Sequence, residues 1–93
     1  MPVTVHISTS LRVFAGGRDH VVLEGSPATV ADALDVLWAV YPGLRDRVAN
    51  EEGQIREHVN VFVGQENVRY TGGLGTPLPE GGELSIFHAV SGG

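Results

Sequence analysis

The stretch Glu83-Leu-Ser-Ile-Phe-His-Ala-Val90 alternates apolar and polar side chains and runs directly into Ser91-Gly92-Gly93. Alternation with a period of two predicts a β-strand that is buried on one face, here the face of Leu84 and Ile86. Taken as the carboxyl end of the protein, the two glycines would present a free α-carboxylate on a segment without side chains. We therefore interpret this strand as the element that positions a reactive carboxyl terminus.

The rest of the chain supplies partners for this strand. Alternating or strand-like runs occur at Val3–Thr9, His20–Glu24, His58–Val63 and Asn67–Tyr70. Gly16-Gly17 marks a turn between the first two runs, which are expected to form a hairpin with a long loop.

One substantial helix is predicted in the middle of the chain. Thr29-Val-Ala-Asp32 resembles a capping box with Asp in the fourth position, and Pro42-Gly43 is expected to end the helix. A short helical turn could follow between residues 44 and 50. The helix carries an apolar stripe at helical spacing, made of Val30, Ala33, Leu34, Leu37, Val40 and Tyr41.

This order of elements, β-β-α-β-β-β, predicts an α+β domain with a sheet of four to five strands. One main helix can cover only one face of a small sheet, so the other face should remain largely open. We expect a single domain over residues 1–90 and a flexible Ser-Gly-Gly tail over residues 91–93.

Composition narrows the function. The 93 residues are 42% hydrophobic and 18% charged, as in ordinary soluble domains, and the absence of cysteine excludes disulfides, thiol catalysis and cysteine-bound metals. The net charge of −5 disfavours nucleic acid as a partner, because an acidic surface repels phosphate. The sequence shows neither a signal peptide nor a run of apolar residues long enough for a membrane span. We therefore expect a cytoplasmic protein with no membrane partner.

No pattern in the sequence predicts a catalytic or metal site. The four histidines lie far apart and do not follow a metal-ligand spacing. Gly72-Gly-Leu-Gly75 looks superficially like a phosphate loop, but it lacks the Walker lysine and no clear helix follows it. We expect no bound metal or cofactor, and we interpret the chain as something other than an enzyme.

Phe62 and Phe87 fall on the strand faces opposite the apolar face that should meet the helix. One interpretation is that one or both of them pack beneath a loop. The other is that they form an apolar patch on the open face, close to the tail, on which a partner docks.

The two terminal glycines suit a carboxylate that is activated by another enzyme. A carboxylate must be activated before transfer, which usually requires adenylation by an enzyme that consumes ATP. Gly92 and Gly93 have no Cβ, so they could enter a narrow channel to the nucleotide of such an enzyme. One added residue would move the reacting carbonyl by more than about 3 Å, which is enough to destroy an attack geometry.

Nearly the whole chain resembles the ubiquitin-like sulfur carrier proteins of the ThiS/MoaD family, and within that family the longer CysO-type carriers. The residues that carry the resemblance are Val3-Thr-Val5, Gly16-Gly17, Thr29-Val30 to Leu37, Tyr41-Pro-Gly43, Val59-Asn-Val-Phe-Val63, Val68-Arg-Tyr-Thr-Gly-Gly-Leu74, Gly82-Glu-Leu-Ser-Ile86 and Ala89-Val-Ser-Gly-Gly93.

The resemblance implies a β-grasp fold with the last strand central in a mixed sheet. It also implies that an E1-like enzyme adenylates the Gly93 carboxylate, with consumption of ATP, and converts it to a thiocarboxylate. The carrier would then donate sulfur to a second, biosynthetic enzyme. Phe87 matches the position at which the family places an apolar partner-contact residue, and Ser91 and Gly92 would give access to the terminus.

Alternative functions remain open. The same tail suits a protein-conjugation tag that joins lysines of target proteins through Gly93, and a plain interaction module could end in Gly-Gly by accident. Within the sulfur-carrier interpretation, the acceptor could serve the synthesis of cysteine, molybdopterin, thiazole or a sulfur-containing secondary metabolite.

Overall fold

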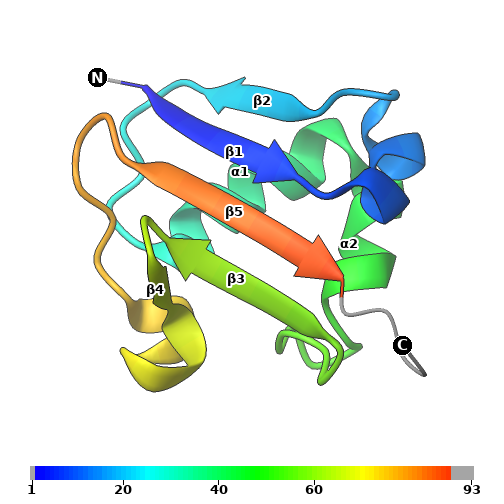
Figure 1. The fold of residues 1–93 in the computed structure, drawn as a ribbon. Helices are drawn as coiled ribbons and strands as arrows, with labels where there is room; N and C mark the ends of the chain where they lie inside the picture. The colour runs from blue at the N-terminus through cyan, green and yellow to red at the C-terminus, as the bar shows by residue number, and fades with distance from the viewer. Residues whose placement is uncertain (1, 89–93) are drawn as a thin grey trace.

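The computed structural model describes residues 2–88, which form a five-stranded mixed sheet with helices packed on one face (Figure 1). The strands follow one another across the sheet in the order β2-β1-β5-β3-β4. Their bounds are β1 Val3–Ile7, β2 His20–Leu23, β3 Val59–Val63, β4 Glu66–Asn67 and β5 Glu83–His88.

The last described strand, β5, lies in the centre of the sheet. It pairs in parallel with β1, with Leu84 opposite Val5, and antiparallel with β3, with Ile86 opposite Val61. Its side chains alternate between the two faces, so Leu84 and Ile86 are completely buried beneath the helices. The sequence pattern predicted both this strand and its buried face.

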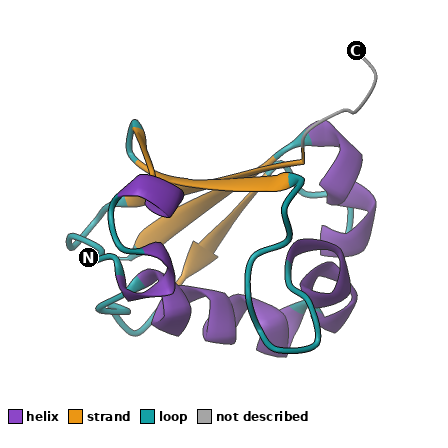
Figure 2. Cartoon of the chain, turned by 90° about the horizontal axis from the view of Figure 1, so that it is seen from below, coloured by secondary structure: helices purple, strands orange, loops and turns teal. Residues whose placement is uncertain are grey.

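Two α-helices, α1 (Val30–Val40) and α2 (Pro42–Val48), cover the buried face, and Figure 2 shows them on one side of the sheet. The Thr29 hydroxyl accepts a hydrogen bond of 3.2 Å from the Asp32 N–H, which caps the start of α1 as the sequence predicted. Pro42 ends α1 and also occupies the first turn of α2, where its missing N–H costs nothing.

The core lies between the sheet and these helices. It joins inward side chains of β1, β3 and β5 to Ala33, Leu34 and Leu37 of α1 and to Leu44 and Val48 of α2. One residue of the predicted apolar stripe differs, since Val40 is 57% exposed at the end of α1.

Two segments differ from the sequence prediction. The predicted strand at residues 67–70 is wrong: β4 ends at Asn67, whose side chain accepts from the Arg69 N–H and begins the short 3₁₀-helix Val68–Tyr70. The predicted hairpin loop contains the 3₁₀-helix Thr9–Ala15, whose residues Leu11 and Ala15 are buried against the core. A further 3₁₀ turn spans Gly73–Gly75.

Candidate functional site

The candidate site is the open face of the sheet around the end of β5, and its centre is a pair of aromatic rings. Phe87 of β5 lies opposite Asn60 of β3, and Phe62 of β3 lies opposite Ser85 of β5. The diagonal between them brings the two rings into an edge-to-face arrangement, with centroids 5.8 Å apart and an interplanar angle of 82°. We call this pair the phenylalanine patch.

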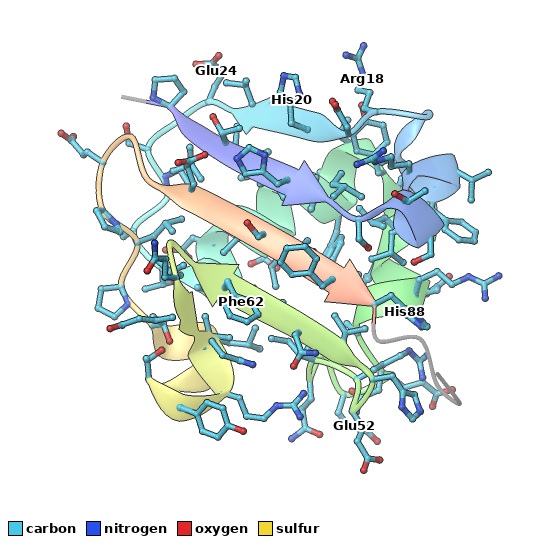
Figure 3. All side chains as sticks on the ribbon, viewed as in Figure 1. Arg18, His20, Glu24, Glu52, Phe62 and His88 are labelled. Atoms are coloured by element: carbon cyan, nitrogen blue, oxygen red, sulfur yellow. The ribbon has the colours of Figure 1, made fainter. Side chains whose placement is uncertain are left out.

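The phenylalanine patch faces away from the helices. Figure 3 shows Phe62 on the side of β3 turned toward the viewer, with the helices behind the sheet. Phe62 is half-buried, whereas Phe87 is 48% exposed. The rings therefore pack against each other, and a good part of Phe87 is available to a partner. Its role in docking remains a prediction.

Polar side chains border the phenylalanine patch on both sides. On the β1 side, His6 Nε2 lies 2.6 Å from Glu83 Oε1, forming an exposed pair. On the β4 side, the Asn67 side-chain amide donates a hydrogen bond of 3.2 Å to Asn60 Oδ1. An apolar centre with a polar rim is the usual anatomy of a protein-docking surface.

Sequence reasoning missed these rim contacts. Side chains alternate along a strand, so the sequence pattern was sufficient to place His6 on the face opposite Val5. Contact between His6 and Glu83, however, depends on the parallel register of β1 and β5, in which Thr4 lies opposite Glu83. Local sequence patterns cannot predict that register, because β1 and β5 are distant in sequence.

The end of β5 is tied to the start of the segment that follows β1. The Ser8 N–H donates to the Ile86 carbonyl at 3.1 Å, and the His88 N–H donates to Ser8 Oγ at 3.4 Å. The chain therefore leaves the sheet from a strand held on both sides. The predicted working end, Ser91, Gly92 and Gly93, lies outside the described residues, and its role stays a prediction.

The glycine-rich segment after residue 71 forms one wall of a hollow of about 730 Å³, floored by the apolar residues Val59, Val61, Val68 and Leu74. Its backbone groups bond to one another, since the Gly75 N–H donates to the Gly72 carbonyl and the Thr76 N–H to the Gly73 carbonyl. The Arg69 guanidinium at the rim donates to the Val59 carbonyl at 3.0 Å. These hydrogen bonds hold the segment in place against the core, and its interpretation as a structural loop stays a prediction.

Titratable groups show no clustering of the kind that binds a metal: among residues 2–88, no three His, Asp or Glu side chains gather at one point. Within the described part of the chain, a clear pKa shift occurs at the exposed Asp19, where a hydrogen bond from His20 lowers the pKa of the carboxyl. Asp19 precedes β2 and lies away from the phenylalanine patch. None of the described helices is long and apolar enough to cross a membrane.

A family model described as the ThiS family matches residues 5–93. The chain belongs to the ThiS family. Sulfur carrier protein CysO of Mycobacterium tuberculosis is 37% identical over 95 residues, with 100% of both chains covered. Small archaeal modifier protein 1 of Haloferax volcanii is 39% identical over 79 residues, which cover 85% of this chain and 86% of the modifier.

Solved structures agree with this membership. A chain in the crystal structure of the Amycolatopsis orientalis BexX/CysO complex matches with a TM-score of 0.86 and 38% identity, over 98% of this chain and 99% of that chain. The resemblance and the ubiquitin-like β-grasp fold expected from the sequence are thus confirmed for this ThiS-family chain. By their names, its relatives include a sulfur carrier and a small protein modifier.

Proposed function

We propose that this protein is a sulfur carrier that holds a transferable sulfur atom as a thiocarboxylate on Gly93 and has no catalytic activity of its own. The observation that carries this proposal is the full-length similarity, at 37% identity, to a sulfur carrier protein. The absence of cysteine agrees with it, because a sulfur carried on the chain terminus needs no resident thiol.

The chemistry divides into two balanced steps. The Gly93 carboxylate attacks the α-phosphorus of ATP, forming an acyl-adenylate and releasing pyrophosphate. Hydrosulfide then attacks the activated carbonyl carbon, the bond to AMP breaks, and a thiocarboxylate, AMP and a proton remain. An E1-like partner enzyme supplies ATP and sulfur, and a biosynthetic enzyme later accepts the sulfur.

The phenylalanine patch is suited to docking these partners in turn. Phe87 precedes Gly93 by six residues, and six extended residues span at most about 20 Å. A partner that binds the open face can therefore have its nucleotide site or acceptor site within about 20 Å of Phe87, where the Gly93 carboxylate can reach it. The rigid central strand fixes one end of that span, which reduces the volume that the carboxylate must search.

Intact mass measurement tests the proposal. The protein is incubated with ATP, its cognate activating enzyme and sulfide, and we expect a mass increase equal to the exchange of one oxygen for one sulfur. Deleting Gly93, or adding one alanine after it, should abolish the increase, whereas one alanine added before Met1 should not. No increase in the unmodified protein, together with normal sulfur transfer after Gly93 deletion, would refute the proposal.

A second function is favoured by one observation, the similarity to a small archaeal modifier protein. In this alternative, the activated Gly93 carbonyl forms an isopeptide bond with a lysine of a target protein. The chain has no lysine, so it could not extend itself into a chain of modifiers. Peptide mapping of cell extracts distinguishes the two functions, because only conjugation leaves the tail attached to lysine side chains.

A further inference from the structure

The outer edge of β2 carries unpaired backbone groups. In an antiparallel ladder, successive residues point their N–H and C=O groups alternately toward the two sides of the strand. The Ile7 N–H donates to the Asp19 carbonyl, so Val21 and Leu23 share the side that faces β1. The backbone groups of His20 and Val22 therefore point outward, and β2 is an edge strand among the described residues.

Apolar side chains gather along this same edge. A groove of about 550 Å³ runs between β2 and the last turns of α1. Val36 and Val40 lie one helical turn apart in its lining and are 38% and 57% exposed, and Val22 of β2 is 48% exposed. Val36 and Val40 lie on the helix side of this edge, where Leu23 is buried and Val21 packs against the core. Val22 alternates with Val21 and Leu23 along β2, so its side chain lies on the open face.

The charges along the edge are arranged so that the edge is complementary to itself. Figure 3 shows Arg18 at one end of β2, Glu24 at the other end and His20 between them. Two copies related by a two-fold axis normal to the sheet would have their β2 strands antiparallel, with Val21 of one copy opposite Val21 of the other. Arg18 of each copy would then approach Glu24 of the other, which gives opposite charges at both ends.

We propose that β2 pairs antiparallel with β2 of a second copy of this chain, centred on Val21, so that the two sheets become one continuous sheet. His20 and Val22 of each copy exchange the backbone hydrogen bonds that are otherwise left to water. On the helix side of the sheet, Val36 and Val40 of the two α1 helices pack against each other. This assembly is independent of sulfur transfer.

The proposed contact is short, so the dimer should be weak and concentration-dependent. β2 contains only four residues, and the apolar part consists of a few valines. An interface of this size belongs with the small, transient class. A low affinity is also consistent with a carrier that must release one partner before it meets the next.

Sedimentation velocity from micromolar to millimolar concentration measures the association. We expect the average mass to rise from 9.8 kDa toward twice that value. Amide hydrogen exchange should slow with concentration at His20 and Val22 but not at Val21 and Leu23, which already face β1. If the protein remains monomeric at every concentration, the proposal is wrong. This holds also if exchange at His20 and Val22 slows only when an activating enzyme is added.

Two sets of variants locate the contact. Val40→Arg places like charges face to face beside the edge and should abolish the mass increase, whereas Val13→Arg, at a residue that is 75% exposed elsewhere, should not. Glu24→Arg alone and Arg18→Glu alone should each raise the dissociation constant about tenfold, since both ends of the dimer acquire like charges. The double variant should recover affinity. Unchanged association in Val40→Arg and Glu24→Arg, with normal thermal unfolding, overturns the proposal.

Discussion

Replacing Phe87 with alanine tests whether the exposed ring serves docking, because its contribution to folding can be bounded. The residue is 48% exposed, so folding removes from water about half of an aromatic surface of roughly 150–250 Å². At about 25 cal/mol per Å², the buried half contributes roughly 2–3 kcal/mol, as an upper estimate. A 93-residue domain has a stability of about 5–14 kcal/mol, so the variant should remain folded.

The expected effect on binding is of similar size but appears in a different measurement. If Phe87 is the centre of the docking surface, its truncation costs about 2 kcal/mol or more of binding free energy, or roughly a 30-fold rise in Kd for the activating enzyme. Isothermal titration calorimetry measures the Kd, and urea unfolding measures the stability. Both use the same protein preparations.

Two control variants separate the two effects. Val61→Ala truncates a residue that is 1% exposed on the helix side of β3, so it should lower stability by about 2 kcal/mol without changing Kd. Tyr70→Ala removes a ring that is 83% exposed elsewhere and should change neither quantity. If Phe87→Ala and Val61→Ala weaken binding equally, the loss reflects destabilisation, and the docking argument is refuted.

Three further predictions concern the scaffold. Gly82→Ala places a Cβ 2.8 Å from the Pro79 carbonyl oxygen, so urea unfolding should show a loss of about 1–3 kcal/mol. Thr29→Ala removes the cap of α1 and should cost about 1 kcal/mol in the same measurement. The hydrogen bond from His20 lowers the pKa of Asp19 below its ordinary 3.8, so the stability it adds is present above pH 3.8 and is lost as the pH falls through the lowered pKa. In His20→Gln, an NMR titration should show that pKa rising toward 3.8, and an unchanged titration would contradict the contact.

Hydrophobic periodicity predicted the main elements because burial dictates which side chains must be apolar. The alternation over Val3–Ile7 and the helical spacing over Val30–Leu37 each identified an element and its buried face. The same patterns could not predict segments held by local hydrogen bonds. Asn67 begins a 3₁₀ turn by accepting from the Arg69 N–H, which apolar spacing does not record.

The candidate site shows a similar division. The parity of Phe62 and Phe87 within their strands placed both on the open face, and that placement needed only the alternating pattern. Contact between the two rings requires the antiparallel register in which Asn60 lies opposite Phe87. The same holds for the β2 edge, because its order in the sheet depends on pairings between segments distant in sequence.

The phenylalanine patch and the β2 edge lie on different parts of the molecule, which bears on how they would work together. β1 separates β2 from β5, so a second copy approaches in the plane of the sheet, whereas a docking partner approaches along its normal. A two-fold axis normal to the sheet keeps both open faces on one side. The proposed dimer would therefore present two phenylalanine patches in the same direction, and occupation of one surface would not block the other. For an activating enzyme that itself has two-fold symmetry, such a pair of carriers could bind with a higher effective concentration than two separate monomers.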